Sequence, residues 1–509
     1  MQDIQKTISY KDNLQAFYAR RCDTLNTLLL ESSSHEIHKS KLTLLGISCA
    51  VKVICRGSHV TVLSLSKNGD ALLARVLKNA PQQGLEQYTY SESDHKIEFE
   101  FRNDFRGLDE RQRLQRRGQF HCLKLINQEL GEFKDILFAG VISFDYINNF
   151  EHVHDFGQGH NDFADYVFYV FDIVITLNNK ERTARIDGYV FGDDRDHLKE
   201  KIEEIAAEYE KCTDAFECSN DDVLELEYRT QTSDEEFCRI VERVKEHIRD
   251  GDAFQIVPSR TFEIECRDPQ RSFAYLKKDN ASPYMFYLHD TEFTMFGASP
   301  EFALRVDMPN RMVYISPIAG TKKRGTDEQG RLDRDLDSRI ELELRTDSKE
   351  IAEHMMLVDL ARNDLARISK PATVRVENML HIDKYQSVQH MVSDVIGRID
   401  DCFDAFHAYL ACMNMGTLSG APKIMAHKII YQFEGRKRGA YGGTVCKLLP
   451  DGSLDSCIVI RTAVVKNDTA YVQAGCGVVA YSDPLSEALE TKQKARSVLH
   501  AIAKANLEG

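Results

Sequence analysis

Two short acidic patterns, Glu350-x-x-Glu353 and Glu487-x-x-Glu490, constrain the fold of this chain more than any other feature. Residues three apart lie on one face of an α-helix, so each pair can direct two carboxylates toward one place. From spacing alone, each pair fits either a solvated helix face or half of a hard-cation site. A fold in which the two helices face each other would bring the four carboxylates together.

The residues around both pairs predict helices. Between Ser348 and Leu365, apolar side chains recur at helical steps on more than one side of the segment. A carboxylate on such a covered helix is destabilising unless it is paired or coordinated. The second pair follows Tyr481-Ser-Asp-Pro484, where Ser or Asp can cap a helix and Pro suits its first turn. This second helix is predicted to begin just beyond a strand over 469–480.

Composition excludes several classes of protein. With 509 residues, 42% hydrophobic and 28% charged, the chain is typical of a globular protein with two or more domains. It has no apolar stretch long enough to span a bilayer and no signal-peptide core, so we expect a cytoplasmic protein without a membrane partner. Thirteen cysteines without a Cys-x-x-Cys pattern indicate reduced thiols. The net charge of -15 weighs against nucleic acid as a partner.

The chain is predicted to divide near residues 210–230. An N-terminal region over 1–215 contains apolar segments of strand type at 42–54 and 166–175, and it ends in a charged helix over 196–211. A polar stretch over 213–222 is a plausible linker to a second region over 230–509. The alternation of strands and helices in this second region predicts an α+β fold.

Three segments of the second region predict ligand binding. A strand from residue 313 runs into Gly320-Thr321, where a glycine lets backbone N–H groups approach an anion and a hydroxyl adds a donor. Arg461 lies in an otherwise apolar strand and needs a carboxylate or phosphate partner, which is either a ligand or an internal acidic side chain. Gly475 and Gly477 interrupt the next strand pattern, which predicts a bulge or the close approach of a ligand.

Five motifs, in this order, resemble those of the chorismate-utilising enzymes. They are Pro317-Ile-Ala-Gly-Thr-Lys-Lys-Arg-Gly325, Glu350-Ile-Ala-Glu-His354, Met415-Gly-Thr-Leu-Ser-Gly-Ala-Pro-Lys423, Arg438-Gly-Ala-Tyr-Gly-Gly443 and Pro484-Leu-Ser-Glu-Ala-Leu-Glu490. The resemblance covers about Gln231 to the end. Within the family the motifs resemble those of the large subunits of anthranilate synthases, and the N-terminal third resembles these subunits as well. It implies an α+β fold with layered antiparallel sheets and flanking helices around a central cleft.

Two positions distinguish the activities within this family. Relatives that form para-aminobenzoate carry a nucleophilic Lys where this chain has Ala319, and relatives that form isochorismate or salicylate use a water-activating Lys where it has Gln255. An amide is a poor base for water, whereas unprotonated ammonia is already a nucleophile. The resemblance therefore implies conversion of chorismate and ammonia to anthranilate and pyruvate, the first step of tryptophan synthesis. Aminodeoxychorismate or isochorismate synthesis is the alternative.

The resemblance also implies roles for single residues. Glu353 and Glu490 are expected to hold Mg2+ at a substrate carboxylate, and the other Glu of each pair to reach the ion directly or through water. Glu301 matches the family's general acid, which needs a raised pKa, and His390 matches the histidine that supports elimination of pyruvate. The residues expected to bind chorismate are Gly320, Thr321, Thr417, Tyr441, Arg461, Gly475, Cys476 and Gly477.

Regulation and partners are implied in the same way. Leu29-Leu-Glu-Ser32 and the segment from Asn280 to Met285 resemble those that bind tryptophan as a feedback inhibitor, so we expect Ser32 to meet Pro283, Tyr284 and Met285 around L-tryptophan. The chain has no glutaminase nucleophile motif. A separate glutamine amidotransferase subunit is therefore implied as the ammonia donor, in a heterotetramer of two large and two small subunits.

Two other classes of protein fit part of the pattern. A di-metal carboxylate helical protein also uses Glu pairs, but it needs a Glu-x-x-His on facing helices, whereas here His354 is adjacent to Glu353 and the second pair has no His. A non-catalytic amino-acid sensor would explain the segments around Ser32 and Tyr284. It would leave Arg461, Glu301 and the acidic helices without a role.

Overall fold

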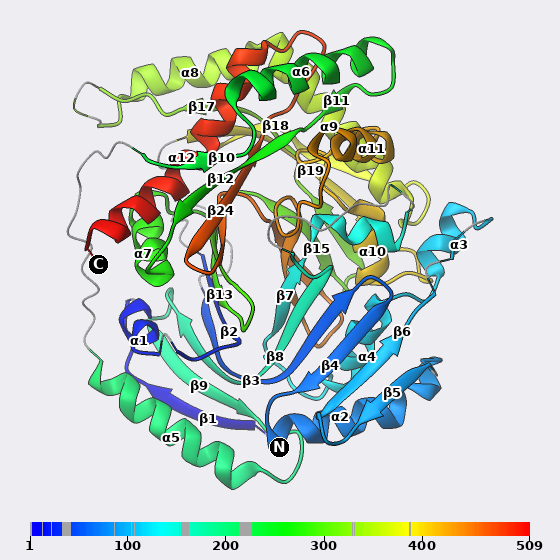
Figure 1. The fold of residues 1–509 in the computed structure, drawn as a ribbon, viewed down its shortest axis with the longest axis vertical. Coiled ribbons are helices and arrows are strands. Elements are labelled where there is room, and N and C mark those ends of the chain that lie inside the picture. The colour runs from blue at the N-terminus through cyan, green and yellow to red at the C-terminus, as the bar shows by residue number, and fades with distance from the viewer. Residues whose placement is uncertain are drawn as a thin grey trace.

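Most strands of the molecule belong to one large antiparallel sheet that closes on itself, with helices on its outside (Figure 1). The computed structural model describes residues 3–508 except 13, 22, 33–41, 86, 103, 106, 152, 154–161, 213–225, 328, 330 and 386–387. The linker predicted over 213–222 lies outside the described residues.

The described residues of the N-terminal region form nine strands, two of which were predicted. The strands are β1 (Asp3–Ile8), β2 (Thr27–Glu31), β3 (Leu42–Arg56), β4 (His59–Ser64), β5 (Tyr88–Ser91), β6 (Lys96–Glu100), β7 (Phe138–Ile142), β8 (Tyr166–Asn178) and β9 (Thr183–Tyr189). The helices are α1 (Gln15–Ala19), α2 (Lys67–Asn79), α3 (Glu110–Gln115), α4 (Phe120–Glu129) and α5 (Arg195–Lys211), with 3-10 turns η1 (Pro81–Gln83) and η2 (Phe144–Asn149). The predicted apolar strands are β3 and β8, which pair with each other, and the predicted charged helix is α5.

The C-terminal region supplies the remaining elements. Its strands are β10 (Arg229–Thr230), β11 (Gln255–Ile256), β12 (Ser259–Glu265), β13 (Tyr284–His289), β14 (Thr294–Ser299), β15 (Phe302–Asp307), β16 (Met312–Ile315), β17 (Ile318–Lys323), β18 (Arg375–Lys384), β19 (Val388–Arg398), β20 (Gly420–Ala421), β21 (Thr444–Leu448), β22 (Leu454–Ile458), β23 (Thr462–Lys466) and β24 (Thr469–Gly475). Its helices are α6 (Asp234–Arg249), α7 (Pro269–Asp279), α8 (Arg334–Thr346), α9 (Ser348–Ala366), α10 (Ala405–Cys412), α11 (Lys423–Glu434) and α12 (Pro484–Glu508).

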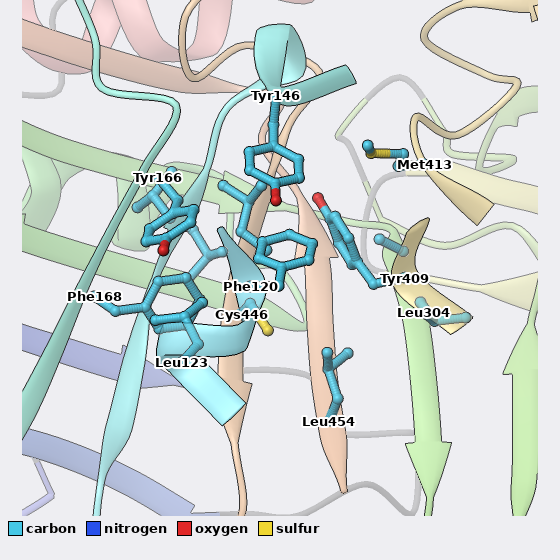
Figure 2. Packing of buried hydrophobic residues seen from close by; sticks show 14 of the residues in the cluster. Phe120, Leu123, Tyr146, Tyr166, Phe168, Leu304, Tyr409, Met413, Cys446 and Leu454 are labelled. Carbon is cyan, nitrogen blue, oxygen red and sulfur yellow. The ribbon is translucent and has the colours of Figure 1, made fainter. Parts of the chain in front are cut away.

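Strands from the two regions are hydrogen-bonded neighbours. β2 pairs with β13, with Glu31 opposite Met285, and β7 pairs with β21, with Val141 opposite Val445. The boundary predicted near 210–230 therefore separates two stretches of sequence that share one sheet. The hydrophobic core also crosses it, since Phe120 of α4 packs beside Tyr409 of α10 (Figure 2), with ring centroids 5.7 Å apart.

Both acidic helices form where the sequence predicts them. The Asp347 side chain accepts hydrogen bonds from the backbone N–H groups at the start of α9, and the Asp483 carboxylate accepts one from Ser486 N at 2.9 Å at the start of α12. The strand predicted over 469–480 is shorter, because β24 ends at Gly475 and Cys476 N instead donates to Pro258 O at 3.2 Å. α9 packs on β17 and β19, at the upper end of the molecule in Figure 1.

Two expectations from composition concern membranes and thiols. Within the described ranges, no helix has both the length and the apolar character that a bilayer span requires. The cysteines whose positions are described are free thiols, most of them buried. The free thiols agree with the reduced cysteines expected from the sequence.

Candidate active site

Glu301 lies between β14 and β15 and is buried beside Thr417, whose Oγ1 donates to Glu301 Oε1 at 3.1 Å. Burial raises the pKa of Glu301 to about 7, although the Thr417 hydroxyl and the cations Lys494 and Arg461 act in the opposite direction. A carboxyl group with this pKa is partly protonated near neutrality. It can therefore donate a proton to a leaving group, as the general acid implied by the sequence must.

His390 lies on β19 directly opposite Thr321 of β17. Its Nδ1 is 2.8 Å from Thr321 Oγ1, and the Tyr385 ring stands edge-on to the imidazole with centroids 5.3 Å apart. Burial lowers the pKa of His390 to about 4, and the positive charge of Arg461 acts in the same direction. The imidazole is thus neutral near pH 7, with its ring orientation fixed, and it is able to accept a proton.

Arg461 immediately precedes β23 and has the left-handed backbone angle φ 51°, which costs a non-glycine residue about 1–2 kcal/mol. Glu301 and Glu490 act electrostatically on its guanidinium, and burial lowers its pKa. Neither carboxylate, nor any other in the described part of the chain, forms an ion pair with Arg461. The sequence leaves open whether Arg461 pairs with an internal acidic side chain or with a ligand. Since no internal pair is found among the described residues, the guanidinium is available to an anionic ligand.

The Gly475-Cys476-Gly477 backbone is approached closely by three side chains. Lys494 Nζ donates to Gly475 O at 3.0 Å, and the Tyr441 hydroxyl lies 3.0 Å from where a Cβ on residue 475 would be. Gln255 Nε2 lies 2.7 Å from the corresponding position at Gly477. A side chain at residue 475 would also clash with backbone, because Pro258 O is 2.6 Å from its Cβ position. Gln255 is buried, and its Oε1 has no hydrogen-bond partner among the described residues.

The acidic pairs lie in the first turns of α9 and α12. The hydroxyl of Tyr481, just before α12, donates to Glu353 Oε1 at 3.1 Å and so joins the two helices. Burial raises the pKa of Glu350, and so does the neighbouring Glu353. Burial also raises the pKa of Glu487, and the charge of Glu490 adds to that effect.

The four carboxylates do not form one preassembled cage. Among the described residues, no three His, Cys, Asp or Glu side chains gather closely enough to hold a metal ion. Glu490 pairs with Lys494 at 2.7 Å, and Lys349 lies 3.8 Å from Glu353. Glu487 Oε2, however, is buried with no hydrogen-bond partner in the described structure. Because Mg2+ keeps water or substrate oxygens and takes few carboxylates, the donors fit an ion that arrives together with a substrate carboxylate.

The two segments predicted to bind an inhibitor come together, as expected. Since Glu31 of β2 is opposite Met285 of β13, Ser32 follows at the level of Tyr284. Pro283 and Met285 are buried, whereas Ser32 and Tyr284 are half-buried, and the Tyr284 hydroxyl donates to an Asp455 oxygen at 3.4 Å.

Sequence reasoning missed Tyr385, which contacts His390, because a single Tyr in a polar stretch carries no signal of such a contact. Lys494, one helical turn beyond Glu490, pairs with Glu490 within α12. It also donates to Gly475 O, and this contact depends on how α12 packs beside β24.

Comparisons with known proteins agree with this arrangement. Residues 74–500, which span both predicted regions, match the family of chorismate binding enzymes. Anthranilate synthase component 1 of Vibrio cholerae is 42% identical over 500 residues, covering 97% of this chain and 94% of that protein. The protein of the same name from Escherichia coli is 42% identical over 506 residues, covering 98% and 96%.

Solved structures show the same fold. The crystal structure of anthranilate synthase component I from Streptococcus pneumoniae matches with a TM-score of 0.68 at 25% identity, covering 91% of this chain and 93% of that one. The menaquinone-specific isochorismate synthase of Escherichia coli matches with a TM-score of 0.64 at 15% identity, covering 98% and 94%. The expected α+β fold of antiparallel sheet with flanking helices is confirmed. The chain therefore belongs to the chorismate binding enzymes and, within that family of chorismate-utilising enzymes, to the anthranilate synthase component 1 proteins.

Proposed function

We propose that this chain converts chorismate and ammonia to anthranilate and pyruvate, with Mg2+ as its cofactor. The observation that carries the proposal is the guanidinium of Arg461, which forms no ion pair within the described ranges of the chain and lies close enough to act on buried Glu301. An unpaired cation beside a carboxyl group with a pKa of about 7 suits a substrate that bears a carboxylate and must lose a hydroxyl group.

Each residue then has one task. Arg461, Tyr441 and the Gly475-Cys476-Gly477 backbone bind the enolpyruvyl side chain and its carboxylate, and Gly320, Thr321 and Thr417 bind the rest of the substrate. Ammonia forms a bond to ring C2 while the C4–O bond breaks, and Glu301 gives its proton to the departing oxygen so that water leaves. His390 next accepts the proton on C2. The bond between ring C3 and the side-chain oxygen breaks, the released enolpyruvate takes up a proton to become pyruvate, and the ring becomes aromatic.

Glu353 and Glu490 are the proposed ligands of Mg2+, with Glu350 and Glu487 close behind them. When bound, the ion draws negative charge from the ring carboxylate and so favours addition at C2. Lys349 and Lys494 lie beside Glu353 and Glu490 and reduce the negative charge of the two acidic helices. They thereby weaken the repulsion of the anionic substrate before Mg2+ binds.

The choice of ammonia over water rests on two side chains. Ala319 offers no amine, and Gln255 places an amide beside Gly477. The unpartnered Gln255 Oε1 can accept a hydrogen bond from ammonia, but an amide cannot remove a proton from water. This chemistry favours anthranilate over para-aminobenzoate or isochorismate.

Ammonia and feedback complete the proposal. The name "component 1" of the relatives points to a second component, and we propose that it is a glutamine amidotransferase that supplies ammonia within a heterotetramer of two large and two small subunits. L-tryptophan is proposed to bind at Ser32, Pro283, Tyr284 and Met285, where β2 meets β13. Inhibition follows if this effector prefers a conformation that binds chorismate poorly.

The test is to mix the purified chain with chorismate, Mg2+ and an ammonium salt and to follow anthranilate fluorescence. We expect product that depends on all three additions and disappears with excess chelator. A folded protein that gives no product under these conditions refutes the proposal. Formation of para-aminobenzoate or isochorismate instead would show that Ala319 and Gln255 do not determine the nucleophile.

A further inference from the structure

A buried carboxylate of the N-terminal region bonds to a loop of the substrate site. Asp145, in η2, is 2% exposed. Its Oδ2 accepts a hydrogen bond from Gly439 N at 2.6 Å, and its Oδ1 accepts bonds from Arg438 N at 3.2 Å and from the Tyr431 hydroxyl at 2.6 Å. The carboxylate and the tyrosine are 286 residues apart in the chain.

The loop held by Asp145 carries Tyr441. Gly439 and Gly442 flank that tyrosine with φ of 66° and 75°, the left-handed region that glycine enters readily. Beyond Tyr441 the loop is held by bonds from Gly443 N to Ala440 O and from Gly442 N to Val459 O, both at 2.9 Å. Phe144 N also donates to Gly439 O at 2.9 Å. The segment around Asp145 therefore binds both the N–H and the C=O group of Gly439.

Arg438 extends this support to two other segments of the site. Its guanidinium donates to Leu418 O at 2.8 Å, next to Thr417, and to Val257 O at 2.6 Å. Val257 precedes Pro258, whose carbonyl accepts the bond from Cys476 N. The guanidinium is itself fixed by Glu434, with a shortest contact of 2.5 Å. A shift of the Arg438 backbone would therefore reach every one of these loops.

We propose that Asp145 is a positioning residue for substrate binding: by accepting the amide hydrogens of Arg438 and Gly439, it holds the loop of Tyr441 and, through Arg438, the loops of Thr417 and Cys476. Asp145 touches no substrate atom in this scheme. The inference depends on the proposed roles of Tyr441 and Thr417 in binding chorismate. Burial raises the pKa of Asp145 to about 6, so keeping this carboxylate charged costs free energy. The hydrogen bonds from Tyr431, Gly439 and Arg438 offset part of that cost.

Asp145→Asn is the direct test, because it keeps the shape but replaces one acceptor by an N–H2 donor. In either orientation of the amide, one backbone or hydroxyl donor then faces another donor. Tyr431→Phe is the matched control, since it removes the bond to Asp145 that does not come from the loop. For Asp145→Asn we expect the KM for chorismate to rise about tenfold or more, with kcat at saturating chorismate and ammonium changed less than about threefold. For Tyr431→Phe both parameters should stay within about threefold.

Hydrogen exchange of the peptide containing residues 438–443 gives a readout that does not depend on turnover. In the unmodified protein these amides should be protected, and in Asp145→Asn they should exchange faster while the rest of the chain is unchanged. Rapid exchange of this peptide in the unmodified protein overturns the proposal, even if the variant fails to fold. So does a folded Asp145→Asn protein with an unchanged KM, or one with a lower kcat at constant KM. Absence of anthranilate formation by the unmodified protein would instead refute the proposed function.

Discussion

Replacing Glu301 by Gln should abolish turnover and also make the protein more stable at alkaline pH. Burial raises the pKa of Glu301 from 4.5 to about 7. In the window between these values the native protein binds more protons than the unfolded chain, so its free energy of unfolding falls as the pH rises. A shift of about 2.5 units corresponds to roughly 3 kcal/mol at high pH. A neutral Gln does not ionise and avoids this loss.

The difference between the two proteins is therefore expected to depend on pH. The difference in free energy of unfolding between Glu301→Gln and the unmodified protein should grow by about 2 of the roughly 3 kcal/mol between pH 5.5 and pH 8.5. Urea unfolding followed by circular dichroism at several pH values in this range measures it. The kcat of Glu301→Gln, measured by anthranilate fluorescence, should fall by about 10²–10⁴, the usual worth of a general acid. In the unmodified enzyme, kcat should fall above about pH 7 when the concentration of free ammonia is held constant.

Thr417→Val is the matched variant, because it keeps the ionisable carboxyl group but removes the hydroxyl that stabilises its charge. A hydrogen bond to a charged group is worth about 1.5–3 kcal/mol, so the pKa of Glu301 should rise by about 1–2 units. The alkaline fall in kcat should then move to higher pH. If the stability difference between Glu301→Gln and the unmodified protein is the same at every pH, or if kcat survives, the assignment of Glu301 as a buried general acid is wrong.

Three other predictions test the remaining parts of the site. Arg461→Gln should raise the KM for chorismate about a hundredfold without lowering the melting temperature, because it removes the cation for a substrate carboxylate; an unchanged KM would show that this cation binds nothing. Glu353→Gln and Glu490→Gln should each abolish turnover but leave tryptophan binding, measured by calorimetry, largely intact. Near-normal turnover in either variant would indicate that the acidic pairs are solvated helix faces and not metal ligands. Ser32→Ala should weaken inhibition by L-tryptophan about tenfold at constant KM, and full inhibition would place the effector elsewhere.

Local patterns predicted most of what lies on single elements. The acidic pairs fall on α9 and α12 because helical spacing and the capping residues Asp347 and Asp483 are signals within a few residues. The sequence predicts Arg461 in one continuous apolar strand, whereas in the structure β22 ends at Ile458 and β23 begins at Thr462, and Arg461 lies between them without an ion pair among the described residues. β24 ends earlier than predicted because its last residues bond to the Pro258 segment, which only the folded chain brings near.

Long-range pairing was beyond the sequence. Nothing near Glu31 indicates that β13 will be its neighbour, although the likeness to known inhibitor segments implied that Ser32 and Tyr284 would meet. The support that Asp145 gives to the Tyr441 loop had no signal at all, because a single Asp in an apolar stretch usually acts as a local cap. Helical spacing accounts for the lysines beside Glu353 and Glu490, since each lies four residues away on the same helix, but it does not determine how α9 and α12 are arranged relative to each other.

The pairing of β2 with β13 and of β7 with β21 also bears on how the chain is made. During synthesis, β2 and β7 leave the ribosome long before their partners exist, so each presents an unpaired edge and apolar side chains to the surrounding solution. Closing such distant contacts is slow, because the entropy of a long loop is lost before the contact forms. The nascent chain should therefore complete its sheet only after β21 has emerged, and chaperones that bind exposed strand edges should associate with it until then.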